Sequence, residues 1–204
     1  NTLILSSQSA LVTTRLAEFS QQFIGTPYYE GSLGEGANGL YDQFPLQRFD
    51  TFDCQTFVET MLALANAQTP QQFPQLLRQL RYNRGNIAFE QRNHFISDWI
   101  KHNSAQYFIR DINRDIAGNH VMLAHALIDK QNWYRQLPMD RIRLNAPNVH
   151  QRSLRLNSLH DYAARVSNDN FSLNYIPLSA IFSNLALLNK IPSGSIIFIV
   201  RPNW

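Results

Sequence analysis

The sequence predicts an α+β fold, in which a layer of helices packs on a small, mostly antiparallel sheet. Apolar residues recur at helical spacing after Cys54 and again after Pro70, which predicts two helices with buried faces. Residues 195–200 form a continuous β-branched and aromatic run after Pro192 and Gly194, which predicts a buried strand. With 204 residues, the chain suits a single domain, 1–204, with its own hydrophobic core.

The composition is that of an ordinary globular protein. Hydrophobic residues make up 44% and charged residues 16%, which argues against disorder. The net charge of +3 is compatible with an anionic polymer as partner, but the basic residues are scattered, so nucleic acid is not predicted. No stretch approaches the roughly 20 apolar residues that would span a membrane, so no transmembrane segment is predicted.

The first helix is predicted from an apolar stripe and its flanking residues. Ser6 or Ser7 would cap it, and Gly25 followed by Pro27 would end it. Its stripe consists of Val12, Leu16, Phe19 and Phe23. Residues 25–50 then contain closely spaced glycines and tyrosines, which predicts a surface loop.

The helix that begins near Cys54 carries the chemistry that the sequence predicts. Thr51 and Asp53 are both acceptable N-caps, so Cys54 falls in the first turn on either assignment. Free N–H groups and the positive helix end favour a thiolate there, as in many nucleophilic cysteines. The alternative is that Cys54 is a small buried hydrophobic residue.

The remaining elements follow from periodicity and from Pro and Gly punctuation. Beyond the cysteine helix we expect helices at 71–81, around 95–100, at 121–137 and at 179–188, strands at 107–112 and near 142–144, an extended segment at 174–177, and the strand at 195–200.

The single cysteine excludes an internal disulfide, and no Cys/His spacing predicts a metal or cofactor site. The chain begins at Asn1 without methionine, which is typical of a processed N-terminus, for example after removal of an export signal. A free thiol in an exported protein is most simply explained by catalysis.

Four stretches together resemble a known family. Asp53-Cys54 at the start of a helix, preceded by Gly25-Thr26-Pro27-Tyr28-Tyr29, is similar to NlpC-type, papain-like bacterial cell-wall hydrolases. The finer resemblance rests on three longer strings: Phe52-Asp53-Cys54-Gln55-Thr56-Phe57-Val58-Glu59, Arg81-Tyr82-Asn83-Arg84-Gly85 and Arg92-Asn93-His94-Phe95-Ile96-Ser97-Asp98-Trp99. Within that superfamily they resemble a domain-of-unknown-function branch linked to N-acetylmuramoyl-L-alanine amidase activity.

The resemblance implies a papain-like cysteine hydrolase of peptidoglycan, periplasmic or secreted, that cleaves an amide in or next to the murein stem peptide. Cys54 would be the nucleophile and His94 a further catalytic residue, while Tyr28, Asp53 and Arg92 would bind substrate. From the residues alone, Tyr28 could equally be a packing residue and His94 a hydrogen-bonded structural residue. The arginines at 81–84 could cap a helix or meet stem-peptide carboxylates.

The resembled enzymes carry a histidine base in a His-x-Gly motif after the first strand of the sheet. This sequence contains no such motif before Trp204. Three explanations compete. We favour a fold that is incomplete at its C-terminus, truncated after the first sheet strand. His94, His120 or His125 could instead supply the base, or the chain could be a non-catalytic murein-binding or structural domain with a buried Cys54.

Overall fold

The computed structural model describes residues 2–8, 10–145 and 149–201, so the interpretations placed on Asn1 and Trp204 lie outside the described residues. The N-terminal half contributes helices α1 to α5: α1 (Thr2–Ser6), α2 (Val12–Gln22), α3 (Cys54–Asn66), α4 (Gln72–Arg81) and α5 (Ile96–Ala105). The other half contributes α6 (Asn113–Ala117), β1 (Met122–Ile128), α7 (Lys130–Arg135), α8 (Val149–Tyr162), β2 (Asp169–Tyr175) and α9 (Leu178–Ser183). The chain is therefore mixed helix and strand, as predicted.

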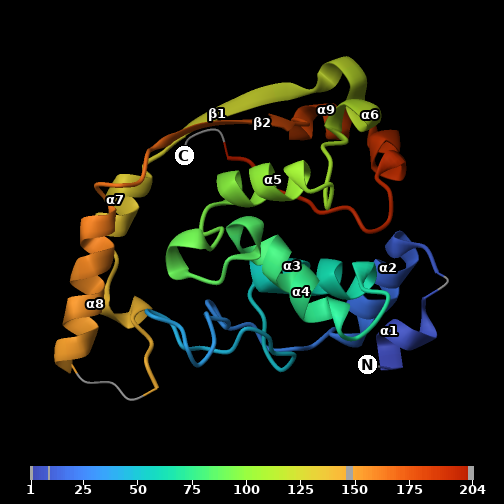
Figure 1. The fold of residues 1–204 in the computed structure, drawn as a ribbon. Coiled ribbons are helices and arrows are strands. Elements are labelled where there is room, and N and C mark those ends of the chain that lie inside the picture. Colours follow the sequence, from blue (N-terminus) through green and yellow to red (C-terminus); the bar gives the residue numbers. More distant parts are fainter. Residues whose placement is uncertain (1, 9, 146–148, 202–204) are drawn as a thin grey trace.

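Helix α3 lies at the centre of the main core, packed between α2 and α4 (Figure 1). Its apolar positions are buried together with Phe19 of α2, Leu77 and Leu80 of α4, and Trp99 of α5. The stripes predicted for these helices are confirmed except at Val12, which is exposed, while Leu16, Phe19 and Phe23 of the same stripe pack in the core. The first helix differs in its start, because α2 begins at Val12 after Leu11 and the predicted caps Ser6 and Ser7 belong to the end of the separate helix α1.

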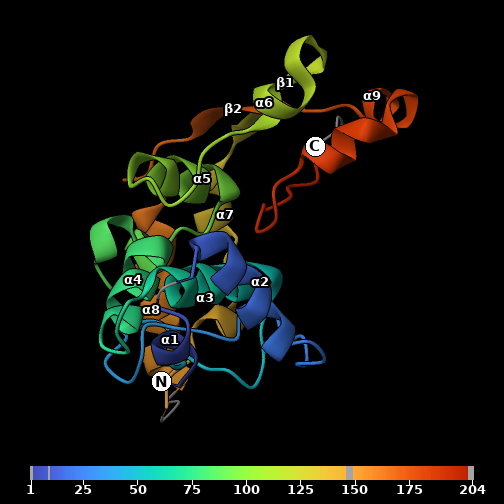
Figure 2. The same ribbon diagram turned by 90° about the vertical axis from the view of Figure 1, so that its right-hand side faces the viewer.

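The sheet consists of β1 and β2, paired antiparallel from Met122↔Tyr175 to Ile128↔Asp169. This ribbon arches over α5, from α7 at one end to α6 and α9 at the other (Figure 1). Figure 2 shows the same order of layers from the side: the ribbon, then α5, then α3 and α4. The ribbon therefore covers α5, and α5 separates it from the cysteine helix.

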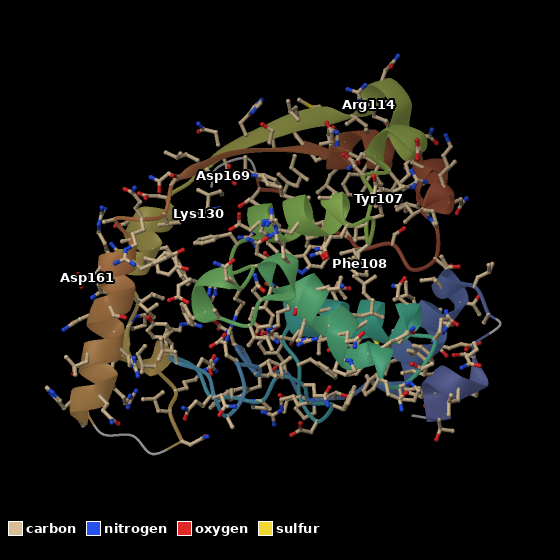
Figure 3. The ribbon with its side chains drawn as sticks, viewed as in Figure 1. Tyr107, Phe108, Arg114, Lys130, Asp161 and Asp169 are labelled. Carbon is tan, nitrogen blue, oxygen red and sulfur yellow. The ribbon has the colours of Figure 1, made fainter. Side chains whose placement is uncertain are left out.

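An ion-pair cluster ties the end of the ribbon to α5. The Lys130 ammonium at the start of α7 lies 2.6 Å from Asp98 Oδ1 in α5 and 3.7 Å from Asp169 Oδ2 at the start of β2. Figure 3 shows Lys130 and Asp169 at this corner. Because Lys130 is buried, its two carboxylate partners fix the corner more firmly than an exposed pair would.

The predicted helix at 121–137 is wrong in its first half. Residues 122–128 form β1, and only Lys130–Arg135 are helical, with Asp129 as N-cap accepting from Asn132 N. Met, Leu and Ala favour helix, but pairing with β2 overrides that preference. The predicted strand near 142–144 is limited to one isolated bridge between Asp42 and Arg143.

A second core cluster lies between α7, α8 and the loop before α3. Its buried members include Tyr41, Tyr134, Ile142, Leu156 and Leu159. It connects the ribbon side of the molecule to the loop that approaches the start of α3. The sequence did not predict α8, which occupies a polar stretch with only two fully buried residues.

Two predicted strands are also wrong. Tyr107 has a positive φ of 62° and ends α5 in a tight turn, so residues 107–112 do not form a strand. Residues 195–200 lack strand pairing in the structure. Ile196 and Phe198 pack against the helical core while Ile197 and Ile199 are exposed, so the run has the alternation of a strand without a partner. In the segment predicted to be extended at 174–177, Asn174 and Tyr175 end β2, and Ile176 and Pro177 connect it to α9. Helix α9 is followed by the 3-10 helix η5 (Leu185–Lys190).

Candidate active site

Cys54 is the first residue of α3, and its side chain is exposed. Asp53 is the N-cap: its Oδ1 accepts from Thr56 N at 2.7 Å, and Thr56 Oγ1 accepts from Asp53 N at 2.9 Å. This reciprocal capping box satisfies two backbone donors. The prediction of Asp53 or Thr51 as cap is thereby resolved in favour of Asp53, and the alternative of a buried Cys54 is wrong.

The loop that carries Tyr28 is held against the start of α3 by backbone bonds. Tyr29 N donates to Phe52 O at 2.9 Å, and Phe52 N donates to Pro27 O at 3.2 Å. Gly31 N donates to Asp53 Oδ2 at 3.0 Å, with Gly31 at a φ of 65° that favours glycine. One carboxylate therefore caps the cysteine helix and holds the loop.

Tyr28 lies close enough to Cys54 and Asp53 for their charges to affect it. The pKa of its hydroxyl is raised, first by desolvation and then by Cys54 and Asp53. The side chain is 70% exposed, so the hydroxyl is a protonated donor that solvent and solutes can reach at neutral pH. The structure thus brings Tyr28 close to Asp53 and Cys54, and their predicted roles in substrate binding and catalysis stay predictions.

The start of α3 also offers unused donors. Thr56 N is occupied by the cap, whereas the N–H groups of Cys54 and Gln55 make no hydrogen bond to the described residues. Such groups at a helix N-terminus favour an anion or a developing oxyanion beside the thiol.

Arg92 lies in a buried ion-pair cluster. Its Nη2 pairs with Glu35 Oε1 and, at 3.0 Å, with Asp42 Oδ2, which also pairs with Arg143. Arg92 Nη1 reaches Leu33 O at 3.5 Å. Burial raises the pKa of the Glu35 carboxyl, although Arg92 opposes this. The ion pairs and hydrogen bonds of the Arg92 side chain are therefore with the loop of residues 33–42, next to Gly31, and its guanidinium also lies over the Phe89 ring.

His94 is packed between aromatic rings. Its Nε2 lies 2.7 Å from Phe89 O, and its ring centroid lies 4.4 Å from Phe89 and 4.9 Å from Trp133. A carbonyl oxygen only accepts, so Nε2 carries the proton and Nδ1 is the basic nitrogen. Burial, followed by the charge of Arg92, lowers the pKa of His94 well below 6.5. In the described part of the chain, no hydrogen bond joins the Cys54 thiol to a histidine.

Sequence reasoning missed Glu59, which is fully buried in α3. Its Oε1 accepts from Gln55 Nε2 at 2.9 Å and from Trp99 Nε1 at 3.0 Å, and Gln55 Nε2 also donates to Asn93 O at 3.0 Å. These bonds join the residue after Cys54 to the residue before His94. A glutamate on an otherwise apolar helix face is the sequence feature that could have identified it.

Comparison with known proteins identifies the family to which the chain belongs. A family model described as AmiA-like, N-acetylmuramoyl-L-alanine amidase-like, matches residues 18–204. The chain belongs to this AmiA-like family. A crystal structure of a Legionella pneumophila protein of the DUF1460 family is 37% identical to it, with a TM-score of 0.94 over 100% of this chain and 73% of that one.

Two Bacteroides structures resemble the AmiA-like chain more distantly. An N-acetylmuramoyl-L-alanine amidase from Bacteroides uniformis is 20% identical, with a TM-score of 0.58 over 82% of this chain and 66% of that one. A Bacteroides fragilis protein provisionally described as a xylanase is 23% identical, with a TM-score of 0.57 over 79% of this chain and 66% of that one. At these identities the likeness shows the fold alone. No curated protein matches the chain.

Within residues 2–8, 10–145 and 149–201, no group of three or more His, Cys, Asp and Glu side chains could hold a metal ion. None of the helices in those same ranges is both long and apolar enough to cross a bilayer. A surface pocket of about 230 Å³ lies along α4, lined by Leu46, Gln47, Pro74, Leu77, Arg78, Arg81 and Tyr82. Arg81, for which the sequence left carboxylate binding open, is among them, whereas Cys54, His94, Tyr28, Asp53 and Arg92 are not.

Proposed function

We propose that this AmiA-like protein is a papain-like cysteine hydrolase of peptidoglycan, which cleaves an amide bond in or next to the murein stem peptide. The observation that carries the proposal is the exposed Cys54 thiol in the first turn of α3. It lies beside the Tyr28 hydroxyl and beside two N–H groups that bind none of the described residues. Membership of an N-acetylmuramoyl-L-alanine amidase-like family supports the substrate class. That substrate implies a site of action outside the cytoplasm, periplasmic or secreted.

Cys54 is the nucleophile in this proposal. Its thiolate attacks the amide carbonyl carbon, and the oxyanion that forms is stabilised by the N–H groups of Cys54 and Gln55. Collapse of this intermediate breaks the C–N bond, and the amine leaves with a proton. Water then attacks the resulting thioester, releasing the carboxylic acid and the free thiol.

Tyr28, Asp53 and Arg92 form the substrate-binding region. Tyr28 donates its hydroxyl hydrogen to a substrate oxygen. Asp53 acts through Gly31, whose N–H it binds, and so sets the position of the Tyr28 loop relative to the thiol. Arg92 contributes from the other side of that loop, through Leu33 O and the Glu35 carboxylate.

His94 is the proposed proton acceptor, and its hydrogen bond to Phe89 O determines which ring nitrogen can take the proton. Nε2 is occupied by Phe89 O, so Nδ1 has to receive the thiol proton. The lowered pKa keeps the ring neutral and able to accept at neutral pH. The matched variants are His94→Asn, whose side-chain amide can still donate to Phe89 O, and His94→Ala. If His94 is the base, both variants slow Cys54 alkylation by iodoacetamide at pH 7, whereas a purely structural His94 leaves the Asn variant reactive.

The decisive experiment is digestion of purified murein by the natural protein and by its Cys54→Ala and Cys54→Ser variants. Wild type should release new amino termini, and neither variant should. The identity of the new terminus separates the two bonds: L-alanine reports cleavage of the muramoyl amide, and a diamino acid reports cleavage within the stem. Binding without release by wild type would overturn the proposal and leave a non-catalytic murein-binding domain. A Cys54→Ser variant as fast as wild type would also overturn it.

A further inference from the structure

Two side chains stand where the backbone favours glycine. Among the residues that the structure describes, Arg84 and Tyr107 are the non-glycine residues with positive φ, at 52° and 62°. Tyr107 ends α5 in the position that glycine usually takes, with its N–H donating to Ser104 O at 3.1 Å and the next N–H donating to Asn103 O at 3.0 Å. Left-handed backbone is unfavourable for residues with a Cβ.

Within the described residues, these side chains have no polar or ring contact that would offset the strain. Tyr107 is 94% exposed and Arg84 is exposed, and neither side chain makes a hydrogen bond, ion pair or ring contact with the described residues. Figure 3 shows Tyr107 where the chain leaves α5 toward α6. A strained, exposed arginine or tyrosine is more simply explained by contact with a partner than by a role in folding.

The sequence neighbours of the two positions lie next to the same residue of α4. Gln106 Nε2 donates to Gln79 O at 3.3 Å, and a β-carbon placed on Gly85, next to Arg84, would lie 3.7 Å from Gln79 Cγ. We call this region the Arg84–Tyr107 surface; it comprises Arg78, Gln79, Arg84, Gln106 and Tyr107, drawn from the ends of α4 and α5.

The five residues that define the Arg84–Tyr107 surface include two arginines and no acidic residue. Residues 60–89 contain Arg78, Arg81 and Arg84 and no aspartate or glutamate. Arg78 and Arg84 are exposed, while Arg81 is buried. The partner that fits is therefore anionic, and arginine beside tyrosine is the combination that most often supplies binding energy at interfaces.

We propose that the Arg84–Tyr107 surface is a second contact with polymeric peptidoglycan, separate from the site at Cys54. Tyr107 offers a flat face to sugar rings, and Arg84 and Arg78 offer charge-assisted hydrogen bonds to peptide carboxylates. The choice of polymer rests on the function proposed above. The surface holds the protein on the insoluble polymer and takes no part in the chemical step.

The test uses variants that separate side chain from backbone strain. Tyr107→Gly removes both the ring and the strain, Tyr107→Ala removes the ring alone, and Arg84→Gly is the equivalent change at the other position. Arg135→Ala, which removes an exposed arginine from α7, is the control for a lost positive charge. Binding to insoluble murein sacculi is measured by sedimentation in a Cys54→Ala background, together with thermal unfolding.

We expect the three surface variants to bind sacculi about fivefold or more weakly, as for interface positions of these types. Arg135→Ala should bind like the parent. Tyr107→Gly should also melt about 2–4 °C above Tyr107→Ala, because glycine relieves the left-handed strain. Loss of binding with a gain in melting temperature is a combination that a folding defect cannot produce.

Two outcomes would overturn the inference: surface variants that sediment with sacculi as well as the parent, or a parent that does not sediment at all. Hydrolysis of a soluble muropeptide by the same variants with Cys54 restored separates this inference from the proposed function. Unchanged hydrolysis with weaker sedimentation supports both. If wild type shows no hydrolysis but the sedimentation difference holds, the binding surface stands and the cysteine-hydrolase proposal fails.

Discussion

Replacing Asp53 with asparagine separates the two bonds that its carboxylate makes. The asparagine oxygen can still accept from Thr56 N, so the helix cap, worth about 1 kcal/mol, is retained. The asparagine NH₂ group then faces Gly31 N–H, so the bond of 3.0 Å is replaced by two opposed donors. A hydrogen bond to a charged group contributes about 1.5–3 kcal/mol, and Asp53 is half-buried, so we take about 1.5 kcal/mol.

Thermal unfolding provides the first measurement. For a chain of this size, Asp53→Asn should lower Tm by about 3–6 °C, and Asp53→Ala, which loses the cap as well, by about 5–10 °C. Asp129 supplies a matched control, because its carboxylate caps α7 through Asn132 N and makes no second backbone bond to the described residues. Asp129→Asn should melt like wild type.

Amide hydrogen exchange localises the effect. In Asp53→Asn, the Gly31 amide should exchange faster while the Thr56 amide keeps its protection. Murein hydrolysis should fall as well, since the Tyr28 loop is no longer fixed relative to Cys54. An Asp53→Asn protein with wild-type Tm and an unchanged Gly31 exchange rate would refute the reasoning that one carboxylate couples the loop to the helix.

Three further outcomes are expected. Burial raises the pKa of Glu59 above 4.5, so the unfolded chain releases this proton at a lower pH than the folded chain does. The free energy of unfolding should therefore fall as pH rises above about 4.5. Urea titrations between pH 4 and pH 8 should show a shallower fall for Glu59→Gln than for wild type, and equal slopes would contradict the assignment. The pKa of His94 is lowered, so its contribution to stability is lost as pH falls below 6.5, and its imidazole NMR resonances should not titrate between pH 8 and pH 6. A β-carbon on Gly34 would lie 2.4 Å from Asp42 Oδ1, so Gly34→Ala should destabilise the protein by about 1–3 kcal/mol in chemical denaturation, and a neutral result would mean that the loop packs differently.

The helical layer was predictable because its information is local. Apolar spacing identified α2, α3, α4 and α5, and an acceptable N-cap placed the start of α3 at Cys54. The errors lie where local and long-range information disagree. Residues 122–128 have helix-favouring side chains, and only pairing with β2, some 47 residues away at His125 and Ser172, makes them a strand. Residues 195–200 have strand-forming side chains but no strand beside them in this structure.

The same limit applies to the site. Tyr28, Asp53 and Cys54 could be grouped from sequence because each lies in a short motif. The bond from Gly31 to Asp53 could not, since it depends on how a loop of 22 residues closes. Nor could the pairing of Arg92 with Glu35 and Asp42 be foreseen, because nothing near Arg92 in sequence indicates a buried carboxylate.

The charge cluster around Asp42 has a consequence for the order of folding. Asp42 pairs with Arg92 across 50 residues and with Arg143 across 101 residues, whereas α3 and α4 meet across a short turn. Closing such long loops costs chain entropy, so the helical hairpin should form first and the cluster afterwards. Substitutions in the cluster should therefore speed unfolding far more than they slow refolding. The loop that carries Tyr28 would be among the last parts of the protein to become ordered.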